Sequence, residues 1–161
     1  MGRIHQLDEQ FATLIAAGEV ITGPAAVVRE LIDNAIDDEA RTIEISLSEG
    51  GLRSIRVADD GVGMDEDDAV LCLSTHATSK IASPLDLEEI GTLGFRGEAL
   101  AAILSVSRLR LESCADPTAP GVTVRGMGGE LLEVRPVARR RGTTVEVTGL
   151  FYNTPARREY Q

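Results

Sequence analysis

The sequence predicts an α+β fold in which helices cover one face of a mostly antiparallel sheet. Helical patterns cluster early in the chain and strand patterns late. A parallel βαβ fold would instead alternate the two kinds of element along its length. At 161 residues the chain can close one hydrophobic core, so we expect a single domain.

Composition excludes several classes of protein. Hydrophobic residues make up 43% of the chain and charged residues 26%, without the run of about 18 apolar residues that crosses a bilayer. The N-terminus lacks the apolar centre of a signal peptide, so we expect no membrane partner and a cytoplasmic protein. Cys72 and Cys114 predict two reduced structural thiols rather than a disulfide framework or a metal cluster.

The net charge of −10 argues against DNA binding by this chain alone, because phosphate contacts need basic residues concentrated on one surface. The one basic run, at residues 139–141, is assigned to a solvated loop before a strand. Lys80 is the sole lysine, which makes its position worth attention.

The first strong element is a helix over residues 24–37, where Pro24 suits the first turn. At about 100° per residue, the helix has one broad apolar face. That face comprises Pro24, Val27, Val28, Leu31, Ile32, Ala35 and Ile36. Glu30, Asn34 and Asp37 share a narrow opposite stripe. Taken alone, such a stripe is typical of the solvated side of an amphipathic helix.

The remaining elements follow the same rules of periodicity. Further helices are predicted at residues 7–17, 65–73, 85–90 and 98–104, and strands at 42–48, 54–59, 107–113, 121–125, 131–137 and 143–148. Gly50 and Gly51 predict a turn between the first two strands. The strand at 54–59 places Asp59 on the same face as its buried apolar residues, which is unusual for a core position.

Asp59 begins a turn that predicts a ligand site. Gly61 and Gly63 permit a sharp turn and a close backbone approach before Met64, although an ordinary turn explains an Asp-Gly pair equally well. An inward carboxylate without a partner is costly, and an exocyclic amine such as that of adenine would satisfy it. Thr143 lies on the inward face of the last strand and could extend this polar patch.

A second pattern predicts an anion site. Glycines at every third position, from Gly91 through Gly94 to Gly97, run directly into a helix, whose free N–H groups can bind phosphate. Thr78, Ser79 and Lys80 lie in the same long loop and would bring hydroxyls and the lysine to the same phosphates.

In this order, these pieces resemble the ATPase superfamily of type II topoisomerases, ninety-kilodalton heat-shock chaperones, sensor histidine kinases and MutL proteins. Three blocks resemble the MutL-type DNA mismatch-repair family in particular. They are the residues HATSKI at 76–81, LGFRGEAL at 93–100 and FYNTPARR at 151–158. The AAGEV sequence at 16–20 also fits. Blocks of six to eight residues in the correct order are more specific than any lone glycine motif.

The resemblance implies a two-layer sandwich, with helices on one face of a mixed, mostly antiparallel sheet and ATP between the layers. It implies that Glu30 is the general base and that Asn34 supplies an oxygen ligand to Mg²⁺. The lid would run from about Thr75 to Gly97. Nucleotide contacts are then expected from Asn34, Asp37, Asp59, Gly61, Gly63, Met64, Thr78, Ser79, Lys80, Gly94, Phe95, Arg96, Gly97 and Thr143.

Three positions depart from the family pattern. This chain has Asp60, Thr75 and Gly23 where the family usually has Asn, Arg and Arg, respectively. The Asp33-Asn34 pair is closer to the gyrase sequence of this helix. Two alternatives therefore stay open: a topoisomerase-type ATPase domain, and a nucleotide-responsive interaction module without significant hydrolysis. A histidine kinase is disfavoured, because the sequence has no membrane segment or phosphoacceptor region.

The resemblance also implies partners that the residues do not. These are a mismatch-recognition protein, downstream repair enzymes and a second copy of the chain on ATP binding. Family members continue into a second domain that supplies a lysine to the γ-phosphate, and then into a C-terminal dimerisation region. We therefore expect residues 1–161 to be an N-terminal ATP-binding fragment that binds ATP weakly and hydrolyses it poorly or not at all.

Overall fold

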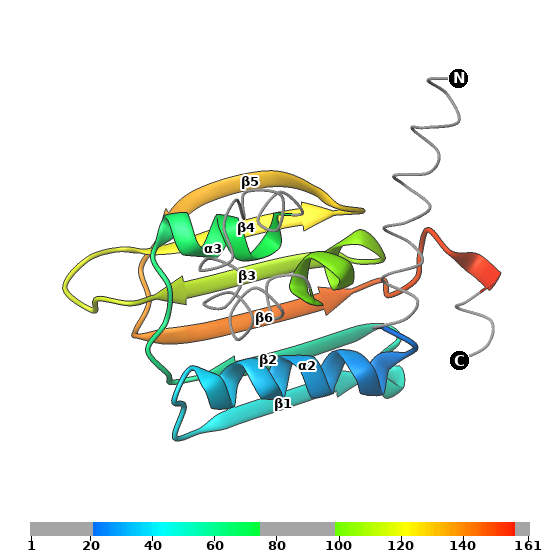
Figure 1. Cartoon of the computed structure of the whole chain (residues 1–161), viewed down its shortest axis with the longest axis horizontal. Coiled ribbons are helices and arrows are strands. Elements are labelled where there is room, and N and C mark those ends of the chain that lie inside the picture. The colour runs from blue at the N-terminus through cyan, green and yellow to red at the C-terminus, as the bar shows by residue number, and fades with distance from the viewer. Residues whose placement is uncertain (1–20, 75–98, 157–161) are drawn as a thin grey trace, which may run out of the picture.

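One six-stranded sheet organises residues 21–74 and 99–156, which are the residues that the computed structural model describes (Figure 1). The strands are β1 (Ile43–Ser48), β2 (Ser54–Asp59), β3 (Arg108–Cys114), β4 (Gly121–Met127), β5 (Glu130–Val137) and β6 (Gly142–Thr148). Their order in the sheet is β1-β2-β6-β3-β4-β5, and each neighbouring pair is antiparallel. The last strand in sequence, β6, therefore lies between β2 and β3.

The helices lie on one face of this sheet (Figure 1). They include α2 (Pro24–Asp37), which packs on β2, and α3 (Glu66–Leu73), which packs on β4. A further helical stretch covers residues 99–105, and a single 3₁₀ turn, η1 (Glu49–Gly51), joins β1 to β2. The predicted α+β class, with helices on one face of a mostly antiparallel sheet, is confirmed. The predicted helices at 7–17 and 85–90 lie outside the described residues.

Local sequence explains where the two labelled α-helices begin. Pro24 occupies the first turn of α2, where its missing N–H costs no hydrogen bond. Asp65 caps α3 by accepting a hydrogen bond from the backbone N–H of Asp68 at 2.9 Å. The first turn of α3 is acidic, as the partial positive charge at a helix N-terminus favours.

The core lies between the helices and the sheet. Buried apolar side chains come from both layers: they include Val27 and Leu31 of α2, Ile103 and Leu104 of the 99–105 helix, and Val145 and Val147 of β6. Fully burying one such side chain stabilises the fold by roughly 1.5–3 kcal/mol. The described residues contain no helix long and apolar enough to cross a membrane.

Two expectations about the first αβ pair need correction. Only Val27, Leu31 and Ala35 of the broad apolar face of α2 are buried, and Ile36 is 60% exposed. The strand β1, expected to be half-buried, is an edge strand in which Ile45 and Leu47 are 44% and 52% exposed. An edge strand has a neighbour on one side only, so alternation in its sequence does not guarantee burial.

Candidate functional site

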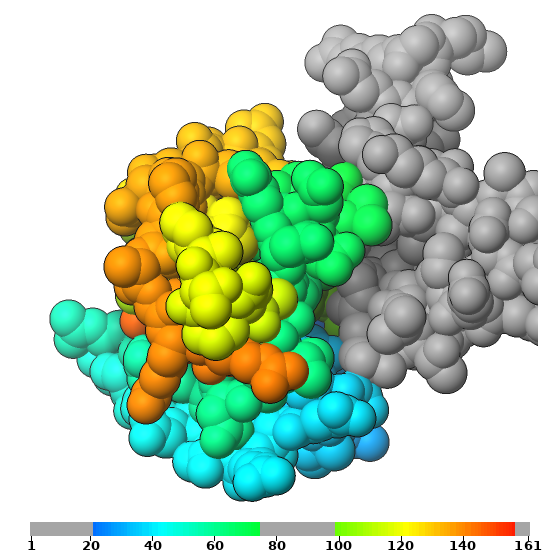
Figure 2. Space-filling view, turned by 90° about the vertical axis from the view of Figure 1, so that its left-hand side faces the viewer, coloured from blue at the N-terminus to red at the C-terminus, as the bar shows by residue number. Residues whose placement is uncertain are grey.

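Three polar side chains form a row at one end of the sheet. In the strand register, Asp59 at the end of β2 lies opposite Thr143 on β6, and Thr143 lies opposite Ser113 on β3. Directly opposed residues point to the same face, so all three side chains lie on the helix side. The sequence placed Asp59 and Thr143 inward, and the register brings them together. This end of the sheet is at the left in Figure 1 and faces the viewer in Figure 2.

Asp59 is a half-buried carboxylate with a perturbed pKa. Burial, followed by the nearby charge of Asp38, raises its pKa to about 6. Hydrogen bonds from the backbone N–H groups of Gly61 and Thr143, and the charge of Arg139, act in the opposite direction. The Gly61 N–H lies 2.8 Å from Asp59 Oδ1. A carboxylate that is costly to ionise, at the end of the otherwise apolar inward face of β2, is a candidate for binding a ligand donor.

The turn after β2 is packed against the C-terminal end of α2. The Asp38 carbonyl accepts a hydrogen bond from Val62 N–H at 2.8 Å, and Asp38 Oδ2 accepts one from Gly63 N–H at 3.2 Å. A Cβ on Gly61 would collide with the Asp38 carbonyl, and one on Gly63 would collide with the Cys114 carbonyl. Both glycines therefore permit close approach of protein backbone, and Gly63 also has a φ of +74°.

Ser113 belongs to this row, although its sequence pattern predicted only a strand residue. Its hydroxyl is fully buried and accepts a hydrogen bond from Met64 N–H at 2.7 Å. It also lies 2.7 Å from Thr143 Oγ1 and 3.1 Å from the Gly142 carbonyl oxygen. The sequence holds one signal for this role: Ser113, like Asp59, is the last inward-facing residue of its strand. The partly buried Met64 is thus tied to the polar row through its backbone.

Glu30 and Asn34 lie on one flank of the buried stripe of α2, not opposite it. Both are half-buried, because each follows a fully buried residue of the stripe by three positions. Burial, then the charge of Asp33, raises the pKa of Glu30, while Arg29 acts to lower it. A raised carboxyl pKa suits a general base that must take a proton near neutral pH. Asp37, one turn further on, is exposed.

The side-chain amide of Asn34 fits a metal ligand. Its Oδ1 and Nδ2 atoms are both buried and have no hydrogen-bond partner among the described residues. Leaving a buried amide unpaired costs about 1–3 kcal/mol, which a ligand could recover. An amide oxygen is a ligand that Mg²⁺ accepts. Within residues 21–74 and 99–156, no three His, Cys, Asp or Glu side chains gather closely enough to hold a metal by themselves.

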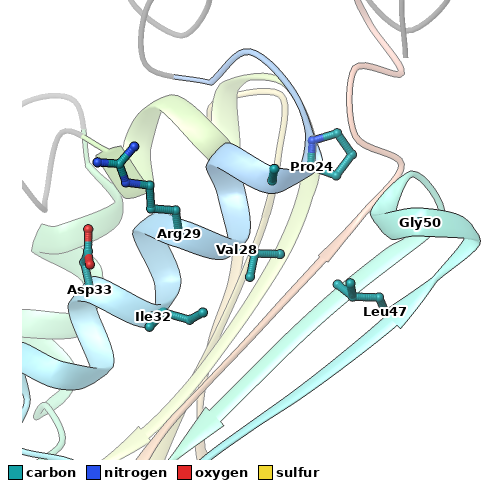
Figure 3. A pocket seen from close by; sticks show the side chains of 8 residues that line it. Pro24, Val28, Arg29, Ile32, Asp33, Leu47 and Gly50 are labelled. Carbon is teal, nitrogen blue, oxygen red and sulfur yellow. The ribbon is translucent and has the colours of Figure 1, made fainter.

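The opposite flank of α2 has a different character. There, Val28, Ile32 and Leu47 line an apolar groove of about 500 Å³ between the helix and β1, with Arg29 and Asp33 at its border (Figure 3). Neither Glu30, Asn34 nor Asp59 lines it. The groove is therefore separate from the polar row.

Several predicted contact residues lie outside the described residues. They are Thr78, Ser79, Lys80, Gly94, Phe95, Arg96 and Gly97, together with Thr75, one of the three departures from the family pattern.

The other two departures from the family pattern, Asp60 and Gly23, lie within the described residues. Asp60 Oδ1 accepts hydrogen bonds from the N–H groups of Arg41 and Thr42 at 2.8 and 2.9 Å, a role that the oxygen of an Asn could also fill. Gly23 precedes α2, and its carbonyl accepts the first hydrogen bonds of the helix.

The fold and this site define a class of protein. The chain belongs to the histidine kinase-, DNA gyrase B- and HSP90-like ATPase family, whose model matches residues 21–124. That match spans α2, the turn after β2 and the chain into β4, and it includes Glu30, Asn34, Asp59 and Ser113 but not Thr143.

More particularly, the chain is similar to DNA mismatch repair proteins MutL, as the sequence blocks predicted. It is 55% identical to the MutL of Anaeromyxobacter sp. (strain K) over 99% of the chain and 26% of that relative. It is 51% identical to the MutL of Geobacillus thermodenitrificans over 99% of the chain and 25% of the relative. The chain thus spans about a quarter of the length of the curated relatives it matches.

Solved structures show the same similarity to DNA repair proteins. A crystal structure of the N-terminal domain of a DNA repair protein matches with a TM-score of 0.76 and 37% identity, over 92% of this chain and 43% of that one. The Aquifex aeolicus MutL ATPase domain complexed with ADP matches with a TM-score of 0.65 and 32% identity, over 88% of this chain and 48% of that one. The predicted MutL-type ATPase domain is confirmed by these similarities.

Proposed function

We propose that this chain binds ATP with Mg²⁺ and hydrolyses it slowly as the ATPase part of a MutL-type mismatch-repair protein. The observation that carries the proposal is the inward, half-buried Asp59 in one row with Thr143, beside the end of the helix that bears Asn34 and Glu30. The neighbour solved with ADP supports a nucleotide as the ligand.

The spacing along α2 orders the parts of the nucleotide. The helix ends against the turn that follows Asp59, through hydrogen bonds to Asp38. Asn34 lies about 6 Å and Glu30 about 12 Å back along the helix axis from Asp38. An adenine held at Asp59 would therefore direct its phosphates past Asn34 toward Glu30.

The roles of the side chains follow from their chemistry. Asp59, when ionised, accepts a hydrogen bond from the adenine amine. Asn34 would hold Mg²⁺ through Oδ1, and the bound ion would neutralise charge on the phosphates. Glu30 holds the attacking water and takes its proton, a task for which burial has raised its pKa.

The wider activity rests on the resemblance to MutL. Nucleotide binding closes the glycine-rich lid, whose residues lie outside those described, and drives self-association and coupling to a mismatch-recognition protein and downstream repair enzymes. We place this activity in the cytoplasm.

A single-turnover experiment tests the proposal. In the presence of Mg²⁺, and with protein at a higher concentration than radiolabelled ATP, slow phosphate release is expected. A non-hydrolysable ATP analogue should show saturable binding. If the analogue binds but no phosphate is released, even when the second domain of a MutL relative is supplied, the interaction module is the better description. Absence of binding at millimolar analogue would refute the nucleotide site itself.

A further inference from the structure

Helix 99–105 is held at its C-terminal end by two segments that lie far from it in sequence. The last carbonyl groups of a helix have no partner within the helix itself. Here the turn between β4 and β5 supplies donors for two carbonyl groups at this end. The Gly129 N–H donates to the Leu104 carbonyl at 3.2 Å, and the Gly128 N–H donates to the Ser107 carbonyl at 3.1 Å.

The segment after β6 supplies donors for the two carbonyl groups in between. The Phe151 N–H donates to the Val106 carbonyl at 2.6 Å, and Asn153 Nδ2 donates to the Ser105 carbonyl at 2.9 Å. Four consecutive carbonyl groups, at residues 104–107, thus accept hydrogen bonds from outside the helix. These four hydrogen bonds are called the clamp below, and Asn153 is the one residue that contributes to the clamp through its side chain.

The segment that carries Asn153 is itself fixed in place. Phe151 is fully buried although its φ is +65°, a backbone conformation that is unfavourable for a residue with a side chain. The Tyr152 ring centre lies 5.7 Å from the guanidinium carbon of Arg108, and a Cβ on Gly128 would lie 2.6 Å from the Tyr152 hydroxyl oxygen. The first residues of the FYNTPARR block therefore build the clamp, a role separate from the polar row.

The helix that the clamp holds is almost completely buried. Each of its seven residues is at most 8% exposed, and Leu100 and Ile103 belong to the same hydrophobic core cluster as Val27 and Leu31 of α2. A close-packed core transmits the shift of one element to its neighbours, because it contains few voids that could absorb the shift. The clamp therefore fixes where this helix lies relative to α2.

The clamp lies far from Asp59. The strand β6 begins opposite Asp59 and ends opposite Ser54, so the segment after β6 lies at the other end of the sheet, at the right in Figure 1. In the proposed function the phosphates extend from Asp59 toward Glu30. A change in the clamp should therefore act on the phosphate end of the nucleotide rather than on the base.

We propose that Asn153 is a positioning residue for the terminal phosphate: it holds helix 99–105 at its C-terminal end and thereby fixes this helix against α2, which carries Glu30 and Asn34. The inference rests on the proposed nucleotide site and adds a residue that need not touch the nucleotide.

The experiment compares the affinities for a non-hydrolysable ATP analogue and for ADP, in the presence of Mg²⁺ and at a temperature where the protein is folded. In Asn153→Ala, affinity for the ATP analogue should fall about fivefold, the value of one hydrogen bond of ordinary strength. Affinity for ADP, which lacks the terminal phosphate, should stay within about twofold. Asn153→His should restore the ATP-over-ADP preference, because the imidazole Nδ1 can donate from the position of the amide nitrogen.

The chain offers a matched control in Asp65. Its carboxylate accepts a hydrogen bond from the Asp68 N–H at 2.9 Å, so Asp65→Ala also removes a bond between a side chain and the backbone at the end of a helix. It should lower Tm in a similar way and leave the ATP-over-ADP preference unchanged. Equal loss of affinity for both nucleotides in Asn153→Ala, or the same change of preference in Asp65→Ala, would show general loosening and overturn the inference.

Hydrogen exchange in the wild-type protein tests the same coupling without a substitution. Coupling between two sites is reciprocal, so the ATP analogue should slow exchange of the Phe151 amide more than ADP does. Both nucleotides are used at equal multiples of their Kd, so that they stabilise the whole fold equally. The Thr118 amide, bonded to Asp116 Oδ1 at 2.9 Å in the loop between β3 and β4, should exchange at the same rate with either nucleotide.

Equal protection of the Phe151 amide by both nucleotides would overturn the inference even if Asn153→Ala does not fold. Wild-type protein that binds neither nucleotide would refute the proposed nucleotide site, and the inference with it.

Discussion

The two flanks of α2 differ although both border the same buried stripe. On one flank, half-buried Glu30 and Asn34 carry a raised pKa and an amide without a partner among the described residues. On the other, Val28 and Ile32 face Leu47 across an apolar groove (Figure 3). Polar groups kept half-buried at a cost in stability indicate function, whereas partly exposed apolar residues beside an edge strand do not need such an explanation. If this contrast is correct, substitutions on the two flanks should separate activity from stability.

The largest effect is expected from Glu30→Gln. Loss of a general base should lower phosphate release about 10²- to 10⁴-fold. Affinity for a non-hydrolysable ATP analogue should change little, since Glu30 acts on water. Glu44→Gln is the matched control, because it removes an exposed carboxylate from the edge strand β1, away from the polar row. Equal hydrolysis by Glu30→Gln and wild type would remove Glu30 from this role.

Asp59→Asn should weaken binding and strengthen the fold. Replacing the acceptor carboxylate with an amide should lower affinity for the ATP analogue about 10- to 100-fold, the range for hydrogen bonds to charged groups. Because the pKa of Asp59 in the fold is about 6, above its usual 3.8, ionisation costs stability. That cost is absent below about pH 4, where both folded and unfolded states are protonated, grows between about pH 4 and 6, and is complete above about pH 6.

Thermal unfolding without nucleotide measures this cost. At pH 8, Asp59→Asn should raise Tm by about 2–4 °C, which corresponds to about 1 kcal/mol after allowance for solvent screening. The gain should vanish at pH 4. Wild-type affinity for the analogue should fall between pH 7 and 5 as Asp59 takes up its proton. Asp60→Asn, at a neighbouring exposed carboxylate, should leave affinity within about twofold.

Asn34→Leu tests the buried amide. The wild-type protein should bind the ATP analogue about tenfold more tightly with Mg²⁺ than with EDTA, whereas the variant should show no such difference. Removing an unpaired amide from a buried position should also raise the free energy of unfolding by about 1 kcal/mol. A variant that keeps the full effect of Mg²⁺ would exclude Asn34 as a ligand.

The smallest effect is expected on the apolar flank. Leu47 is 52% exposed, so Leu47→Ser should change the free energy of unfolding by no more than about 0.5–1 kcal/mol. Affinity for the analogue and phosphate release should stay within about twofold of wild type. A fivefold loss of affinity would show that the groove and the polar row are coupled, and would remove the contrast between the flanks.

The sequence determined much of the fold and part of the site. Helical periodicity predicted α2 with its observed ends, and the period of two in residues 54–59 correctly placed Asp59 inward. The sequence blocks at 76–81, 93–100 and 151–158 indicated the MutL-type family that the comparisons confirm. Local patterns succeed here because helix and strand geometry fix which residues share a face.

Only the tertiary structure could decide which polar residues meet. Ser113 contacts Met64 across 49 residues of sequence, and Thr143 reaches Asp59 and Ser113 because β6 inserts between β2 and β3. The same holds for α2: periodicity separated its polar stripe from its apolar face, but only the sheet places an edge strand beside Val28 and Ile32 and the polar row on the side of Asn34. Strand order depends on pairings between distant segments, whose free energies a local pattern does not contain, so the sequence alone could not assign Ser113 its place.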